Sequence, residues 1–129
     1  MLKLFKKNTF YARIYCDRIV LRFIENNKTI DRVSIIKFSN KRMVLANFES
    51  FESFFQSLIK EMTSISWHSS NRILLQVMEK LEDGLSTVEL RALKDSGMLL
   101  RMSIVKIYTK TDFLSDSKVF EIINSGNSN

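Results

Sequence analysis

The stretch that decides the fold is Arg72-Ile73-Leu74-Leu75-Gln76-Val77-Met78. Its nearly continuous apolar character predicts a strand that is covered on both faces, as in a sheet with helices on either side. A helical pattern lies on each side of it. Residues 47–62 carry apolar side chains at helical spacing, and Asn47 or Ser50 can cap the amino end of that helix. Residues 86–97 predict a second helix.

The second helix has a recognisable start and end. Its first turn reads Ser86-Thr87-Val88-Glu89, a capping box in which the Ser86 and Glu89 side chains each bond the other residue's backbone amide. Leu90 and Leu93 are expected to face inward. Gly97 stands where a helix commonly ends in the left-handed conformation, so we expect that conformation there.

The residues before the first helix predict an antiparallel meander, because they are rich in β-branched and aromatic side chains. Asn26 and Asn27 suit a hairpin turn, since Asn tolerates positive φ. The four strands of the meander are expected at residues 10–15, 18–24, 29–38 and 42–45. After the second helix we expect a strand at 102–108 and a short amphipathic helix at 117–123.

These elements occur in the order β-β-β-β-α-β-α-β-α. Strand–helix–strand units after a meander predict an α/β (α+β) fold class with a mixed β-sheet, in which β-α-β-α units follow the N-terminal antiparallel meander. The 129 residues suit a single domain, expected at 1–123, with a polar, frayed tail at 124–129. Hydrophobic residues make up 45% and charged residues 26%, as in soluble globular proteins.

The composition favours a cytoplasmic protein. No apolar run approaches the ~20 residues needed to cross a bilayer. The basic start, residues 1–7, lacks the apolar stretch of a signal peptide. Cys16 is the single cysteine, so an internal disulfide is impossible, and we interpret it as a buried, inert thiol.

The residues give little support to catalysis. His68 is the single histidine, and it lies beside Trp67 in a polar connection. Glycine occurs at positions 84, 97 and 126 alone, so neither phosphate-binding glycine motif is present. Four acids near the end of the buried strand could hold a divalent ion, although solvated loop charges and the helix cap explain them more simply: Glu79, Glu82, Asp83 and Glu89. We therefore expect no enzyme, and no catalytic, cofactor-binding or metal site.

The net charge of +6 raises a second possibility, nucleic-acid binding. Basic residues concentrate in the first 45 positions, spread through the expected strands and turns. Four aromatic residues of that region are candidates for stacking on bases: Tyr11, Tyr15, Phe23 and Phe38. The same rings serve equally well as core.

The segment from Asn71 to Tyr108 resembles the first subdomain of the MreB family of rod-shape-determining bacterial actins. That family has a buried strand, a helix that reads roughly V-E-R-R-A-x-x-x-S, and a further strand. Here the helix reads Val88-Glu89-Leu90-Arg91-Ala92-Leu93-Lys94-Asp95-Ser96. The resemblance implies an actin-like (ribonuclease H-like) subdomain.

Three departures from the family bear on function. The family's first phosphate loop is rich in Gly and Thr after an Asp, whereas Asp17 is followed by Arg18-Ile19-Val20. Met78-Glu79 replaces the family proline after the buried strand, and Lys110-Thr111-Asp112 replaces an acidic turn. The second phosphate loop and the opposing nucleotide-binding domain have no counterpart in the sequence. The resemblance therefore implies the fold without the ATPase.

We expect a non-catalytic protein-interaction module, linked to cell shape or cytoskeletal assembly. The expected partner is an actin-like filament, another cytosolic assembly or a second copy of the chain. Spare apolar surface is expected on the Phe-rich helix and on exposed sheet edges. The alternative is a basic nucleic-acid-binding domain, with affinity that falls steeply with salt.

Overall fold

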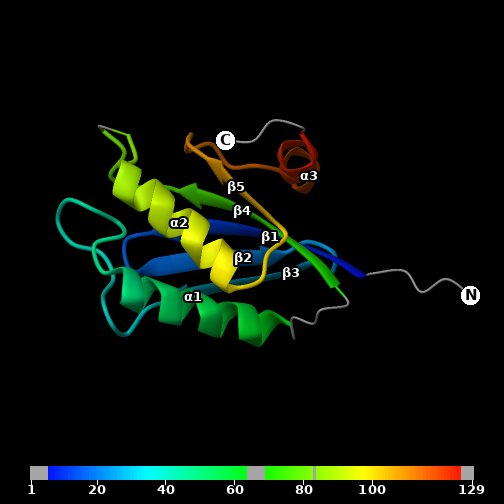
Figure 1. Ribbon diagram of the computed structural model, residues 1–129, viewed down its shortest axis with the longest axis horizontal. Helices are drawn as coiled ribbons and strands as arrows, with labels where there is room; N and C mark the ends of the chain where they lie inside the picture. The colour runs from blue at the N-terminus through cyan, green and yellow to red at the C-terminus, as the bar shows by residue number, and fades with distance from the viewer. Residues whose placement is uncertain (1–5, 64–68, 83, 126–129) are drawn as a thin grey trace, which may run out of the picture.

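The computed structural model describes residues 6–63, 69–82 and 84–125 (Figure 1). Five strands and three helices occur within these residues: β1 (Lys6–Tyr15), β2 (Arg18–Phe23), β3 (Lys28–Val33), α1 (Phe48–Met62), β4 (Ser69–Val77), α2 (Thr87–Leu99), β5 (Ile104–Tyr108) and α3 (Asp116–Asn124). Trp67, His68 and Asp83 lie outside the described residues. No described helix is both long enough and apolar enough to span a membrane.

The strands form one mixed sheet in the order β3-β2-β1-β4-β5. The β1–β2 and β2–β3 pairs are antiparallel, whereas the β1–β4 and β4–β5 pairs are parallel. The predicted mixed sheet, with its meander followed by helix–strand units, is therefore confirmed. β4 is buried from Asn71 to Val77, in agreement with the apolar run that predicted it.

The helices lie on both faces of this sheet (Figure 1). α1 and α2 cover one face, where the larger core joins Phe51 and Phe55 of α1 and Leu93 of α2 to the strands. α3 covers part of the other face, where a smaller core joins Val119 and Ile123 to Tyr11 and Leu74. Burial on two faces is the physical reason for the apolar run of β4.

The helix starts are as the sequence predicted. The Asn47 side chain caps α1 by accepting a hydrogen bond from the Ser50 N–H at 3.1 Å. Both bonds of the Ser86–Glu89 capping box form at the start of α2. Asn27 adopts a φ of 50° in the β2–β3 turn, as an Asn at a tight hairpin can.

The meander is shorter than predicted. β3 ends at Val33 rather than at residue 38, and residues 42–45, predicted as a strand, belong to a loop that runs from 34 to 47. β3 ends where its partner begins, because Val33 pairs with Arg18, the first residue of β2. Further along, the Asp17 carboxylate accepts the N–H groups of Phe38 and Ser39 at 2.7 and 2.8 Å. Backbone groups bonded to a side chain are not available to a sheet ladder, so the chain continues there as a loop.

Gly97 does not end α2, contrary to the prediction. The helix continues to Leu99, and the left-handed residue is Arg101, with a φ of 60°. A Cβ at Gly97 would lie 2.4 Å from Cγ2 of Val105 in β5. The glycine therefore allows the helix to approach the sheet closely, and the chain reverses only beyond that contact.

Candidate functional site

Two of the four acids that follow β4 serve the local structure. The Glu79 carboxylate accepts a hydrogen bond from the Cys16 N–H at 2.7 Å, and Glu89 belongs to the cap of α2. In the described part of the chain, no three His, Cys, Asp or Glu side chains gather in a way that could hold a metal ion.

Cys16 is half-buried in the β1–β2 turn, rather than buried in a strand as predicted. Partial burial raises the pKa of its thiol, because burial disfavours the charged thiolate, and the neighbouring Glu79 carboxylate raises it further. A thiol with a raised pKa is a poor nucleophile at neutral pH, which agrees with the inert role inferred from the sequence.

The loop after β3 is anchored at two points. The Ser34 N–H donates to the Asp17 carbonyl at 2.8 Å, while the Phe38 N–H donates to the Asp17 carboxylate. Phe38 is fully buried, and its ring lies 5.4 Å from that of Phe51. Because Ser34 and Phe38 are both held inward, the residues between them are left on the surface.

The exposed residues of this loop are strongly apolar. Ile35 is 100% exposed, and Val33 and Ile36 are each 69% exposed. Single exposed aliphatic residues are common on protein surfaces, but three within four positions form a continuous patch. Such a patch is typical of a surface that contacts another molecule.

This patch borders a groove between the loop and α1, with a volume of about 540 Å³. We define the loop–helix groove by its lining residues: Val33, Ser34, Ile35 and Ile36 from the loop, and Glu49, Ser50, Ser53, Phe54 and Ser57 from α1. The three serines have small side chains, which keep the α1 wall low. Phe54 gives it an aromatic surface and stacks on Phe38 with ring centroids 6.0 Å apart.

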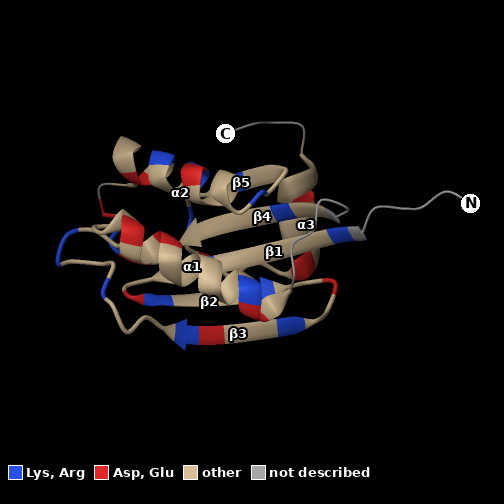
Figure 2. Ribbon diagram, turned by 60° about the horizontal axis from the view of Figure 1, so that its bottom comes forward, with Lys and Arg blue, Asp and Glu red and all other residues tan. Residues whose placement is uncertain are grey.

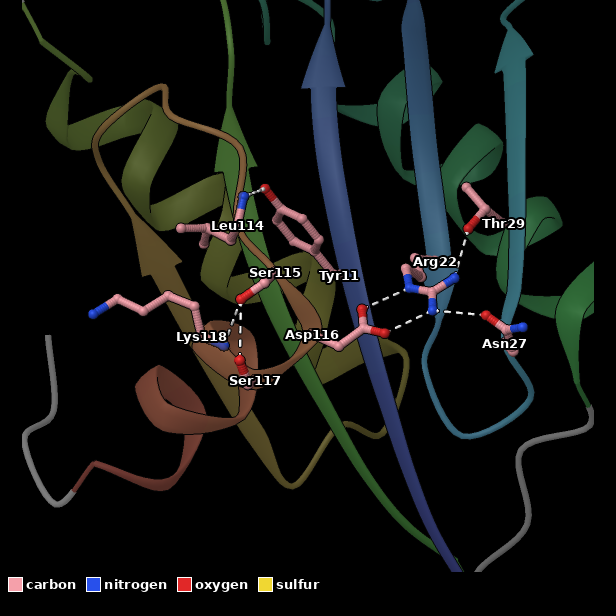
Figure 3. A network of polar contacts seen from close by, with 9 residues as sticks. All are labelled: Tyr11, Arg22, Asn27, Thr29, Leu114, Ser115, Asp116, Ser117 and Lys118. Carbon is pink, nitrogen blue, oxygen red and sulfur yellow. Dashed lines mark hydrogen bonds and ion pairs between the residues drawn. The ribbon is translucent and has the colours of Figure 1, made fainter.

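A second surface lies on the opposite face of the sheet. α3 packs over β4 and β5, so no described helix lies over β2 and β3 on the same face (Figure 3). Three arginines point to this side, and we call them together the arginine face: Arg13 from β1, and Arg18 and Arg22 from β2. Val20 lies between them and is buried.

Arg22 joins the sheet to α3 (Figure 3). Its guanidinium makes two 2.7 Å hydrogen bonds to the Asp116 carboxylate and further bonds to Asn27 and Thr29. The hydrogen bonds from Arg22 lower the pKa of Asp116, since they stabilise the charged carboxylate. The Arg22 guanidinium therefore has a structural role, because its hydrogen bonds hold α3 on the sheet.

The other two arginines stack on aromatic rings. The Arg13 guanidinium carbon lies 4.8 Å from the ring centroid of Phe113, and that of Arg18 lies 4.6 Å from the ring centroid of Tyr15. Arg18 also binds Asp31, whose pKa it lowers. Arg13 makes no ion pair with any described residue, and it borders a pocket of about 390 Å³ with Phe113 and Arg22.

The residues predicted to stack on bases are mostly unable to do so. Phe23 and Phe38 are fully buried, and Tyr11 is buried with its hydroxyl bonded to Gln76. Of the four, Tyr15 alone lies half-exposed on the arginine face. Phe113, which stacks with Arg13 there, was not predictable from the sequence, because no periodicity marks a ring in a loop.

The sequence reading also missed the loop–helix groove. Val33, Ile35 and Ile36 carry the signal, but their β-branched side chains predict the interior of a strand. The Phe-rich helix was expected to expose apolar surface, yet Phe51 and Phe55 are fully buried in the core. The spare apolar surface lies mainly on the loop, and Phe54 is the ring of the helix that adjoins it.

The fold and its surfaces define a small mixed α/β protein with an apolar groove on one side and an arginine face on the other. No protein-family model matches the chain, and no solved structure matches it. The chain is 30% identical over 125 residues to the uncharacterized protein YjaA of Escherichia coli (strain K12), across 90% of this chain and 97% of that protein. The chain belongs to the same family as YjaA.

Proposed function

We propose that this protein is a non-catalytic interaction module that binds a protein partner through the loop–helix groove. The observation that carries the proposal is the exposed patch of Val33, Ile35 and Ile36 beside that groove. Water disfavours such a patch on a small protein unless another surface covers it in the working state.

The energetics favour a specific but modest interaction. Moving one aliphatic side chain from water into a fitted apolar contact contributes about 1.5–3 kcal/mol. Three side chains therefore give roughly 5–9 kcal/mol at full burial. Association costs at least ~4 kcal/mol in lost freedom of motion. The groove thus acts as an anchor, and contacts around its rim complete the affinity.

The kind of partner follows from the actin resemblance. The mixed sheet, in which helix–strand units follow an antiparallel meander, is compatible with the subdomain that the resemblance implies. Because the position of the first phosphate loop carries no glycine after Asp17, the subdomain acts in this proposal as a binding surface and not as an ATPase. A cytoplasmic actin-like filament or cell-shape component is therefore the first class of partner to test.

Affinity capture with matched variants tests the groove. Ile35→Asp places a charge in the patch without touching the core, since Ile35 is fully exposed. Val88→Asp is the matched control, because Val88 is 70% exposed on α2, away from the groove. We expect a protein identified by mass spectrometry to co-purify with the wild type and Val88→Asp and to be lost with Ile35→Asp. Equal recovery of that protein with all three forms of the chain would exclude the groove as its binding site.

The arginine face supports a second candidate function, single-stranded nucleic-acid binding. Two guanidinium groups lie on aromatic rings at a sheet surface, which is a suitable platform for phosphates and bases. Arg13 is the residue that carries this possibility, because it forms no ion pair with any described carboxylate.

A further inference from the structure

We propose that a second copy of the chain occupies the loop–helix groove, so that two copies join through a two-fold interface. This inference rests on the proposed function and names the partner of the same surface. The Ile35 side chain of each copy enters the groove of the other and contacts Ser53 and Phe54 there.

Both halves of a self-complementary contact lie within this one patch. Ile35 protrudes and is wholly exposed, while the serines of α1 leave a hollow beside it. A two-fold interface requires one surface that supplies both the protruding and the receiving part. A second copy supplies both parts at once, whereas an unrelated partner would need a hollow of its own to receive Ile35.

The charges at the rim of the groove are also complementary between copies. Lys37 follows the apolar patch on the loop, and Glu49 lies on the α1 wall. Neither forms an ion pair with a described residue of its own chain. When the loop of one copy lies against α1 of the other, Lys37 of the first approaches Glu49 of the second.

The edge of β3 is a poorer contact between copies. The hydrogen bond from the Ser34 N–H to the Asp17 carbonyl shows which residues of β3 direct their backbone N–H and C=O groups toward β2, because every second residue does so. Three residues therefore direct their backbone groups to the open edge: Thr29, Asp31 and Val33. An antiparallel register centred on Asp31 sets two carboxylates face to face, and one centred on Arg32 sets two guanidinium groups face to face. Figure 2 shows these charges along β3, and charged edges of this kind oppose pairing.

Sedimentation equilibrium measures the association directly. We expect the wild type and Val88→Asp to form a dimer that dissociates on dilution. In Ile35→Asp, which buries a charge at the contact, the dissociation constant should rise by at least about tenfold. A wild type that stays monomeric up to about 1 mM, or a dimer that Ile35→Asp leaves intact, would overturn the inference.

A charge exchange gives an independent test that leaves the apolar patch intact. Lys37→Glu and Glu49→Lys should each weaken the dimer, because each sets like charges opposite one another. The double variant should recover most of the lost affinity. Recovery identifies the contact between copies, since the two residues make no such pair within one chain. Absence of recovery, with both single variants dimerising like the wild type, would contradict the two-fold arrangement.

Failure of this inference and failure of the proposed function are distinguishable. A monomeric wild type that still captures another protein through Ile35 excludes a second copy as the occupant of the groove. The groove then remains the binding surface for that other protein. A dimer that survives Ile35→Asp, together with capture that also survives it, overturns both. Circular dichroism of each variant establishes that it is folded before these comparisons are made.

Discussion

At the scale of single residues, the contact of Gly97 with Val105 sets how closely α2 approaches the sheet. Val105 Cγ1 and Cγ2 would lie 2.9 and 2.4 Å from a Cβ at position 97, much closer than side-chain atoms pack. Gly97 is buried within the helix and lacks the positive φ that often selects glycine. Space, and not backbone conformation, is therefore the reason for this glycine.

Gly97→Ala should destabilise the protein by about 1–3 kcal/mol, because overpacking against Val105 outweighs the ~1 kcal/mol that alanine gains in a helix. Adding Val105→Ala should recover part of that loss by removing the clash. Urea denaturation measures both effects. A Gly97→Ala protein as stable as the wild type would show that helix and strand separate without cost.

Gly84→Ala provides the matched comparison for this experiment. Nothing lies within 4 Å of a Cβ at Gly84, but its φ of +74° strains any other residue. Its cost, about 1 kcal/mol, comes from the backbone alone. Val105→Ala should therefore leave the Gly84→Ala cost unchanged, because the two sites share no contact.

At the scale of elements, α3 is held to the sheet by contacts at both ends. Ser115 caps its amino end by accepting the Lys118 N–H, and Arg22 binds Asp116 in the same turn (Figure 3). At the other end, Arg72 donates to the Asn124 side chain at 2.6 Å. These contacts position a helix that is only nine residues long and too short to be stable alone.

Asp116→Asn should reduce the free energy of unfolding at pH 7 by less than about 1 kcal/mol, because Asp116 is partly exposed and solvent screens the pair. The pKa of Asp116 is lowered in the folded state by its hydrogen bonds with Arg22. The stabilisation is therefore present above the unfolded pKa, near 4, and is lost as the pH falls through the lowered value.

Urea denaturation of the wild type and Asp116→Asn at pH 7 and at low pH measures this dependence. The difference between the two proteins should shrink as the pH falls below about 4. Lys118→Gln is a suitable control, because it changes a charge on the same helix without touching Arg22. A difference that stayed constant with pH would mean that the contact is not ionic.

At the scale of the whole molecule, the sheet separates two surfaces of different chemistry. The loop–helix groove lies beside β3 and α1 and is mainly apolar. The arginine face lies on the side of α3 and adds to a net charge of +6. Because the two surfaces are separate, protein binding and nucleic-acid binding are independently testable.

Titration of a fluorescent single-stranded oligonucleotide tests the second candidate function. If the arginine face binds it, affinity should fall steeply with salt, by a log–log slope of about −0.7 for each phosphate contacted. Arg13→Gln should weaken binding, whereas Arg91→Gln, which removes the same charge from an exposed position on α2, should not. Equal effects of the two variants would indicate attraction to net charge alone.

The local elements were predictable because their signals are local. The apolar run of β4, the helical spacing of α1 and the capping box of α2 each depend on neighbours within one or two turns. Each was read correctly to within a few residues. The first antiparallel strands and their Asn turn were also confirmed, since the preference of Asn for positive φ acts at a single position.

The sequence by itself thus determined the helices, most of the strands and the mixed sheet. Only the tertiary structure decided where β3 stops and what Gly97 is for. Asp17 bonds amides that lie 21 and 22 positions later, and Gly97 meets Val105 across two elements. Contacts between distant residues leave no periodic trace in a sequence. The same long-range bonds leave Ile35 exposed, so the proposed binding surface became visible only in the folded chain.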